Sequence, residues 1–237
     1  MIGSDAYGRD QFSRFLYGGR ISLFAGVLAT AVSLALAIVL GGLAGFYGGW
    51  PDERIMRLAE IFLALPWLYL LFAVRAVFPL QIAPNTIFLL LTVLIGALGW
   101  ARPARLVRGV VLSAKHRDYV LVATGFGASS FYLLRRHILP QAWGVVLTQS
   151  AILIPRYVLA EVVLSLFGLG VSEPAPSWGN LVANLRQYEV LDSYWWMFLP
   201  VLPLLPIFAS YREIFSYYGY CYLDRVIPKG RGSSNWL

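Results

Sequence analysis

Five candidates for functional polar groups are among the ionisable side chains that occur inside or at the ends of strongly apolar stretches of this 237-residue sequence. They are Glu60, Arg156, Glu161, Arg212 and Glu213. Charged groups are costly in hydrocarbon, and such residues transfer ions, contact a solute or pair with a neighbour. Glu161 follows Arg156 by five positions and Arg212 adjoins Glu213, so neither pair is aligned on one helix face. The spacing favours structural roles, either interhelical pairing or a place near the headgroups, with ion transfer and solute contact as alternatives.

The residue types needed for metal binding or covalent catalysis are scarce and scattered. His116 and His137 have no carboxylate or cysteine neighbours at the spacing of metal ligands, which favours surface histidines. The single cysteine, Cys221, has no disulfide partner within the chain. No Gly-x-x-x-x-Gly-Lys-Ser/Thr run occurs, so the chain does not bind ATP with that loop. The sequence predicts no catalytic, cofactor-binding or metal-binding residues and favours a role other than catalysis.

The composition places the chain in a membrane. Hydrophobic residues make up 59% of it and charged residues 13%, and the mean hydropathy is +0.67. Soluble globular proteins contain roughly 45–50% apolar and about 25% charged residues. The same figures exclude intrinsic disorder and a disulfide-stabilised scaffold. An integral membrane protein remains. In such a protein the basic residues that give the net charge of +7 first indicate the membrane topology, before nucleic-acid binding is considered as their role.

Several stretches approach the roughly 20 apolar residues that a membrane-spanning helix requires. The predicted spans are 21–46, 55–78, 86–100 (extending toward 104), 143–169 and 194–218. The predicted fold is therefore an all-α polytopic membrane protein with five transmembrane helices. Gly41 and Gly45 in the first span have a spacing suited to close helix packing. Arg75, near the outer end of the second span, is expected to extend its charged head to the interface.

The basic residues predict the orientation. Twelve of the 19 lie in residues 50–57, in residues 101–141 or after residue 222, which alternation places on one side. This side is predicted to be cytoplasmic, and the N-terminus to lie outside. The predicted divisions are an extracytoplasmic segment 1–20, a transmembrane domain 21–222 with a cytoplasmic loop 101–141 and an extracytoplasmic loop 171–193, and a cytoplasmic tail 223–237. An outside N-terminus that carries arginines normally follows an earlier span, so we expect a helix upstream that this chain lacks.

The cytoplasmic loop is patterned rather than featureless. Residues 118–127 predict a short helix that ends at Gly127, and Ser129 or Ser130 is expected to cap a second one. One face of the first helix is apolar, because its apolar residues follow at intervals of three or four. These residues are Tyr119, Val122, Ala123 and Phe126. Such a helix either lies in the membrane interface or fits into a groove of a partner protein.

The same loop resembles the cytoplasmic signature of ABC importer permeases, in which Glu-Ala-Ala, three residues, Gly, nine residues and Ile-x-Leu-Pro form the site that docks on the ATPase. Val122 and Ala123 take the two Ala places, and Gly127 and the Leu-Pro pair agree. Leu121 stands in place of the Glu and His137 in place of the Ile. The resemblance implies a coupling loop that comprises Tyr119, Val122, Ala123, Phe126, Gly127, Leu139 and Pro140. The missing Glu puts one docking or capping contact in doubt.

Further segments resemble the dipeptide, oligopeptide and nickel permeases, in the order of that family. They are residues 3–23 with Gly-Arg-Asp and Gly-Gly-Arg-Ile-Ser-Leu, 45–52 (Gly-Phe-Tyr-Gly-Gly-Trp-Pro-Asp), 135–140 (Arg-Arg-His-Ile-Leu-Pro), 161–170 (Glu-Val-Val-Leu-Ser-Leu-Phe-Gly-Leu-Gly) and 176–179 (Pro-Ser-Trp-Gly). The closing Gly219, Asp224 and Pro228 resemble its C-terminal end. Members ordinarily have six spans, one of them before the Gly-Arg-Asp segment. The upstream helix expected from topology is therefore also expected from the resemblance.

The resemblance implies a permease subunit in a bacterial or archaeal inner membrane, with a cytoplasmic C-terminus. It would form half of the pathway for peptides or a related small solute such as a nickel chelate or glutathione. The implied partners are a second permease subunit in a heterodimer, two ABC ATPase subunits that carry ATP and Mg, an extracytoplasmic solute-binding protein and the lipid membrane, without nucleic acid. The alternative is a helical scaffold subunit of an ion-translocating or electron-transfer complex. The sequence does not indicate which solute is carried or which residues line the pathway.

Overall fold

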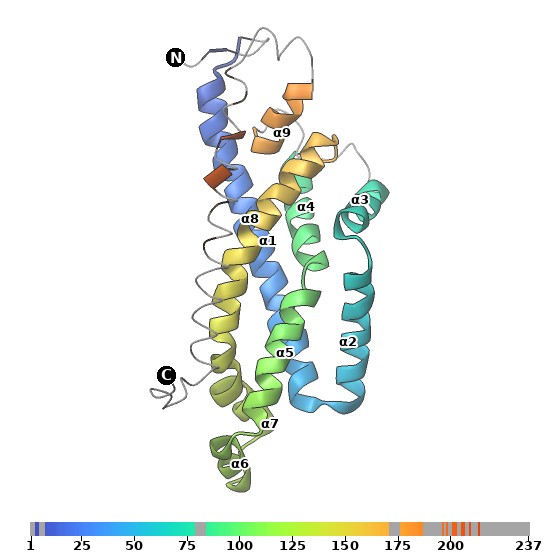
Figure 1. Ribbon diagram of the computed structural model, residues 1–237, viewed down its shortest axis with the longest axis vertical. Helices are drawn as coiled ribbons and strands as arrows, with labels where there is room; N and C mark the ends of the chain where they lie inside the picture. The colour runs from blue at the N-terminus through green and yellow to red at the C-terminus, as the bar shows by residue number, and fades with distance from the viewer. Residues whose placement is uncertain are drawn as a thin grey trace, which may run out of the picture.

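The computed structural model describes residues 3–4, 8–78, 84–170 and 176–186, together with 196, 198, 201–202, 205–206, 209 and 213. All regular elements within these residues are helices. Helix α1 (Gln11–Tyr47) runs along the length of the molecule, and the other long helices pack around it (Figure 1). The predicted all-α fold is confirmed for this part of the chain.

Signals at both ends define α1. The carboxylate of Asp10 accepts hydrogen bonds from the backbone N–H groups of Phe12 and Ser13, at 3.3 and 3.2 Å, and so caps the helix. The Ser13 hydroxyl also donates to this carboxylate and is the main cause of its lowered pKa. At the other end Gly48 has a φ of +66°, which glycine adopts without strain. With 37 residues at about 1.5 Å each, α1 is longer than a bilayer core is thick.

Glycines bring α5 (Ala101–Lys115) into close contact with α1. A Cβ atom at Gly41 would collide with the carbonyl oxygen of Ala104. At Gly45 a Cβ atom would lie 2.8 Å from the carbonyl oxygen of Arg108. The predicted role of these two glycines in close helix packing is confirmed, because no larger residue fits at this separation.

Helices α4 (Pro84–Leu98) and α8 (Trp143–Leu166) also pack along α1. A Cβ atom at Gly26 of α1 would lie 3.0 Å from the carbonyl oxygen of Ile154 in α8. A Cβ atom at Gly96 of α4 would collide with the carbonyl oxygen of Ala29 in α1, an even closer approach. Small residues at these contacts therefore let α4, α5 and α8 all pack closely against α1.

Two of the predicted spans are bent rather than straight. The second consists of α2 (Gly49–Ala64) and α3 (Trp67–Val77), which meet at an angle of 94°. Pro66 explains the break, because proline lacks an N–H group and disfavours the helical conformation of the residue before it. The third consists of α4 and α5, bent by 46° at Gly99 and Trp100. Helix α5 therefore takes up the first part of the predicted loop 101–141 and packs against α1.

The remaining helices lie at opposite ends of the molecule. Helix α6 (Asp118–Gly125) and helix α7 (Ser130–Leu133) project beyond the turn between α1 and α2 (Figure 1). A π-helical turn, η1 (Leu134–Ile138), and a 3₁₀ turn, η2 (Leu139–Ala142), then lead without a break into α8. At the other end α9 (Trp178–Ala183) lies across the tips of α1 and α8 and continues into η3 (Asn184–Arg186).

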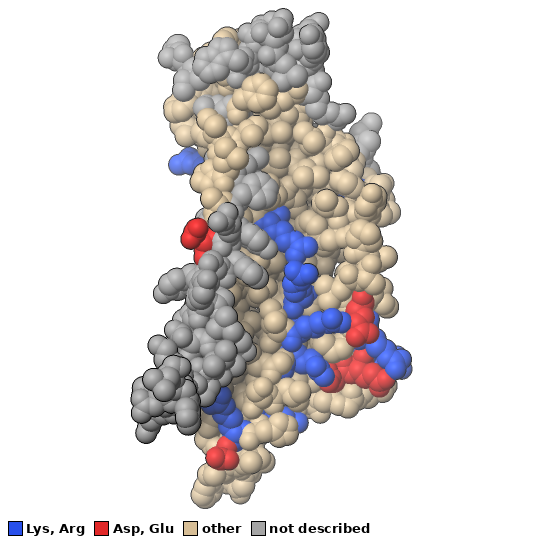
Figure 2. Space-filling model, viewed as in Figure 1, with Lys and Arg blue, Asp and Glu red and all other residues tan. Residues whose placement is uncertain are grey.

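The hydrophobicity of the helices fits a polytopic membrane protein. Helix α1 and the continuous stretch Ser130–Leu166 are each long and apolar enough to cross a membrane, and each bent pair would add one span. The predicted fifth span, 194–218, lies almost entirely outside the described residues. We call the end that holds the α1–α2 turn, α6 and α7 the basic end, since many of the Lys and Arg residues of residues 50–57 and 101–141 lie toward it. Figure 2 shows Lys and Arg over the middle and lower parts of one face.

Candidate functional site

The predicted coupling loop folds into a helical hairpin at the basic end. Helix α6 ends in a Schellman motif, in which the N–H of Gly127 donates to the carbonyl of Thr124 and that of Ala128 to Ala123. Gly127 has a φ of +82°, as this motif requires. The hydroxyl of Ser129 then caps α7 by accepting from the N–H of Tyr132 at 3.4 Å. The two short helices and the Ser129 cap predicted from the sequence are confirmed.

The hairpin exposes apolar side chains. Phe126 is 88% exposed and Val122 is 57% exposed, and Tyr119 is also solvent-accessible. Three further exposed residues extend this apolar surface: Leu121, which takes the Glu place of the signature, and Phe131 and Tyr132, which the signature does not specify. Phe131 and Tyr132 open the second helix, outside residues 118–127, in which the apolar periodicity indicates one apolar face. We call these six residues the hairpin surface.

Two other residues of the signature anchor the hairpin to the bundle and are not part of the exposed apolar surface. Ala123 and Leu139 pack against a buried cluster that includes Val111 of α5 and Ile138. Pro140 lies at the start of η2 and is exposed. The hairpin is therefore attached both to α5 and to the helical stretch that continues as α8. A force on the hairpin surface would be transmitted to both helices, and both pack on α1.

Glu161 forms the centre of a buried polar cluster near the opposite end. Its carboxyl accepts hydrogen bonds from the hydroxyls of Ser22 at 2.9 Å and Ser165 at 3.0 Å. The Ser22 hydroxyl in turn accepts from the backbone N–H of Trp178 at 3.1 Å. The cluster joins α1, α8 and the start of α9. A structural role for Glu161 is thus supported by its neighbours, which the sequence did not identify.

Among the described residues, the other ionisable candidates of the spans do not form a relay with Glu161. Glu60 is exposed and lies 3.3 Å from Arg105, an ion pair between α2 and α5. The guanidinium of Arg156 stacks over the ring of Trp67, 4.9 Å from its centroid. Arg212 lies outside the described residues, and Glu213 is an exposed residue.

The expectation for Arg75 was wrong. Its side chain does not reach the interface, since only 1% of the residue is exposed. Its Nε donates to the carbonyl of Leu169 at 2.9 Å, and its Nη1 donates to the carbonyl of Phe78 at 3.3 Å. Carbonyls at helix ends have no partner within their own helix, and a guanidinium satisfies them. Arg75 therefore ties the end of α3 to the turn after α8.

A further contact at the basic end escaped sequence reasoning. The guanidinium of Arg108 holds the carboxylate of Asp52 with two parallel hydrogen bonds of 2.5 Å. Asp52 is the last residue of the segment 45–52 and Arg108 lies in α5. The two residues are 56 positions apart, so the sequence pattern does not indicate that they pair. This bidentate contact fixes the start of α2 against α5.

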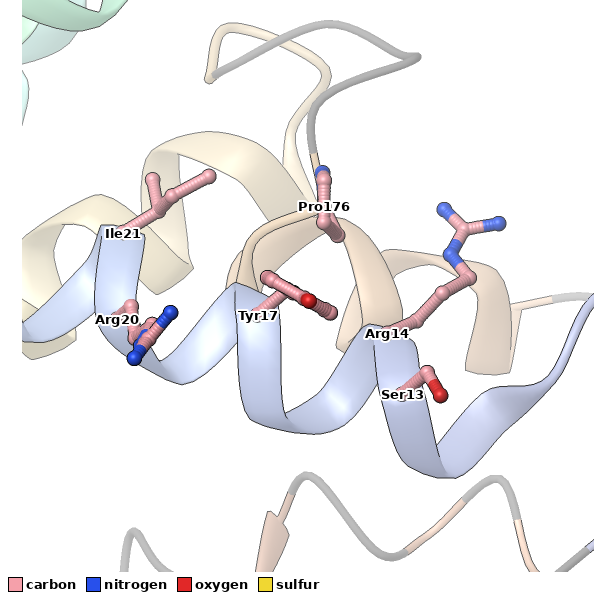
Figure 3. Close-up of a pocket in the computed structure, with 6 residues that line it drawn as sticks. All are labelled: Ser13, Arg14, Tyr17, Arg20, Ile21 and Pro176. Carbon is pink, nitrogen blue, oxygen red and sulfur yellow. The ribbon is translucent and has the colours of Figure 1, made fainter.

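A shallow pocket of about 440 Å³ lies at the end opposite the hairpin. Residues of the first turns of α1 line it together with Pro176, and Tyr17 lies between Arg14 and Arg20 along the helix (Figure 3). Arg20 also contacts the Tyr17 ring. The pocket contains no group able to perform covalent chemistry. Within the described ranges, no three His, Cys, Asp or Glu side chains are grouped so that they could hold a metal ion.

Comparison with known proteins gives a family for this architecture. Residues 37–217 match the family described as binding-protein-dependent transport system inner membrane component. The chain is 39% identical over 200 residues to the dipeptide transport system permease protein DppC of Bacillus subtilis, which covers 84% of the chain and 60% of that protein. It is 34% identical to the oligopeptide transport system permease protein OppC of Haemophilus influenzae, with 97% and 70% covered.

A third relative has a different named solute. The chain is 35% identical to the glutathione transport system permease protein GsiD of Pectobacterium atrosepticum, with 88% of the chain and 66% of that protein covered. The chain thus spans between 60% and 70% of the length of these three relatives.

Proposed function

Because this chain belongs to the family of binding-protein-dependent transport system inner membrane components, we propose that it is a permease subunit of an ABC importer. It forms half of the pathway for peptides or a related small solute, such as glutathione or a nickel chelate. The names of its relatives support this range, since they are permeases of dipeptide, oligopeptide and glutathione transport systems. No observation favours a scaffold subunit of an ion-translocating or electron-transfer complex.

The hairpin surface is the observation that supports the proposal best. Large apolar side chains such as Phe126 and Val122 lie exposed on the part of the basic end that projects past the α1–α2 turn. A helix that lies in the membrane interface would be expected along the side of the bundle rather than beyond its end. Apolar anchors on a rigid projection suit insertion into a groove of another protein. We propose that this groove belongs to an ATPase subunit.

The mechanism is alternating access driven by motion of the ATPase subunits. ATP and Mg²⁺ act on those subunits, and their closure displaces the hairpin. The helical path from α7 through η1 and η2 into α8 has no flexible linker, and it carries the displacement along Ser130–Leu166. The buried contacts of Val111 and Ile138 carry the same motion to α5. The protein supplies shape change and an aqueous route and performs no covalent step.

The assembly and its orientation follow from the same proposal. The importer contains this subunit, a related permease subunit, two ATPase subunits and an extracytoplasmic solute-binding protein. The family is one of inner-membrane components. The basic end faces the cytoplasm, and the sequence distribution of Lys and Arg predicts a cytoplasmic C-terminus as well. The end that holds α9 then faces the binding protein.

Copurification with the ATPase tests the proposal. Phe126→Ala should lower both the retained ATPase and the hydrolysis stimulated by solute-loaded binding protein by about tenfold, as expected for an interface anchor. Phe167→Ala is the matched control, because Phe167 is also exposed and also precedes a glycine in a Schellman motif, after α8. It should change neither quantity by more than about twofold. Absence of any ATPase from the wild-type preparation in mild detergent would refute the proposal.

A further inference from the structure

Arg156 lies at the middle of the membrane-spanning bundle. The hydroxyl of the adjacent Tyr157 donates to the hydroxyl of Ser33 in α1 at 3.0 Å, and Val158 packs on Gly26. Arg156 is therefore level with residues 26–33, in the central turns of α1. At about 1.5 Å per residue, this level is roughly 25 Å from either end of that helix. A charged residue at this depth requires a polar environment.

The guanidinium of Arg156 is not neutralised within the part of the chain that the structure describes. The residue is half-buried, its one recorded contact is the face of Trp67, and no carboxylate pairs with it. The span carboxylates Glu161 and Glu60 are engaged elsewhere, Glu161 with serine hydroxyls and Glu60 with Arg105. The indole Nε1 of Trp67 is also buried without a hydrogen-bond partner there. Two hydrogen-bond donors, the Arg156 guanidinium and the Trp67 indole N–H, thus lie together with no acceptor among the described residues.

A row of positive charge continues from this level toward the basic end. Gly99, immediately before the start of α5, packs on the hydroxyl of Tyr157, the neighbour of Arg156. Arg102 follows in the first turn of α5 with an exposed side chain and no ion pair among the described residues, and Arg105 lies one turn further. Figure 2 shows a band of Lys and Arg side chains from the middle of one face to its lower part. Lipid does not solvate such a row, whereas a water-filled pathway does.

We propose that this face lines the solute pathway and that Arg156 binds a carboxylate group of the transported solute at mid-membrane. The inference rests on the proposed function and adds the chemical class of the solute. A guanidinium presents a fork of N–H donors in its plane, which matches the two oxygens of a carboxylate. The guanidinium lies over the ring of Trp67, 4.9 Å from its centroid, and its N–H donors have no acceptor among the described residues. Arg102, which has no ion pair among the described residues, then provides the next position toward the basic end.

The test compares two peptides that differ only in this group. The complete importer, with both permeases, the ATPases and the binding protein, is reconstituted in vesicles, and uptake of L-alanyl-L-alanine is compared with uptake of L-alanyl-L-alaninamide. The measured quantity is the acid-to-amide ratio, which is the uptake of L-alanyl-L-alanine divided by the uptake of L-alanyl-L-alaninamide. Any preference of the binding protein is the same for every permease variant, so it cancels when the ratios of two variants are compared. Arg156→Gln should lower this ratio about tenfold, and Arg156→Lys, which keeps the charge but not the planar fork, should lower it by an intermediate factor of about three. Arg102→Gln, at an exposed site that tolerates substitution, should lower it by a factor of about three.

Arg54→Gln is the matched control. Arg54 also stacks on a tryptophan, 4.8 Å from the ring centroid of Trp50, but near the α1–α2 turn. Arg54→Gln removes the same charge as Arg156→Gln and should leave the acid-to-amide ratio unchanged. An unchanged ratio in both Arg156→Gln and Arg102→Gln, or an equal fall in Arg54→Gln, would overturn the inference while leaving the proposed function intact. Failure of the wild-type importer to take up either peptide contradicts the proposed peptide transport itself, and the inference with it.

Discussion

The hydroxyl of Ser22 in α1 donates a 2.9 Å hydrogen bond to the buried carboxyl of Glu161 in α8. The same hydroxyl accepts from the backbone N–H of Trp178 at the start of α9. Three segments that are far apart in the sequence therefore meet at one hydroxyl. Closely packed small residues make this possible, since Gly179 contacts Ser165 of the same cluster. The contact holds α9 against the tips of the two longest helices.

Replacing Glu161 should loosen this end of the bundle. Glu161→Ala leaves the buried hydroxyls of Ser22 and Ser165 without their acceptor and opens a cavity, which should cost about 2–4 kcal/mol. Glu161→Gln retains one acceptor oxygen and should cost less than half as much. The midpoint of thermal unfolding of the purified importer in detergent measures both effects. Ser150→Ala, which removes a hydroxyl bonded only to its own helix, serves as the control. Equal midpoints for Glu161→Ala and this control would contradict the structural role.

The separation of α1 and α5 depends on Gly41. Gly41→Leu places side-chain atoms against the carbonyl oxygen of Ala104, so the helices must move apart, at a cost of about 1–3 kcal/mol or more. Gly109→Ala on α5 is the control, because a Cβ atom there meets open space and alanine favours the helix. Unfolding of the detergent-solubilised protein should show a lower midpoint for the first variant and an equal or higher one for the second. The reverse order would show that the two helices are not in close contact.

The turn of the hairpin requires a glycine. Gly127→Val forces a β-branched residue to a φ of +82°, which should cost about 1–3 kcal/mol locally and distort the hairpin. Asparagine tolerates this conformation, so Gly127→Asn should keep most of the function. The measurement is ATP hydrolysis stimulated by solute-loaded binding protein, which should fall severalfold for the valine variant alone. Gly125→Ala, within α6 and facing open space, is the control. Full stimulation with Gly127→Val would mean that the geometry of this turn does not matter.

The pair of Asp52 and Arg108 should contribute more to stability than a neighbouring exposed pair. Its two parallel hydrogen bonds are partly buried, with 17% and 33% of the side chains exposed, so Asp52→Asn should cost about 1–3 kcal/mol. Glu53→Gln breaks the exposed pair with Arg57 and should cost at most about 0.5 kcal/mol. A double-mutant cycle of Asp52 and Arg108 isolates the interaction from other effects of each change. A coupling energy near zero would show that the two residues act independently.

The membrane class, the short helices of the hairpin and the Ser129 cap could be predicted because each depends on neighbouring residues. The helical break at Pro66 had a local signal as well, although only the structure gives its angle of 94°. The exposure of Phe131 and Tyr132 was not predicted, since it depends on where the hairpin projects from the bundle. The same reason explains the error for Arg75, whose depth depends on the carbonyl of Leu169, a residue 94 positions away.

The sequence by itself determined that this chain is a helical membrane protein of the importer family, because apolar content, helical periodicity and ordered motifs are properties of the chain taken segment by segment. Tertiary structure decided what its polar groups do. Glu161 and Arg156 looked alike in the sequence, as ionisable residues in one apolar helix. Packing against α1 and α9 gives Glu161 the hydroxyls of Ser22 and Ser165, whereas Arg156 receives only the ring of Trp67. A charge inside a membrane is governed by the few groups that surround it, and these come from segments more than a hundred residues away as readily as from the next turn.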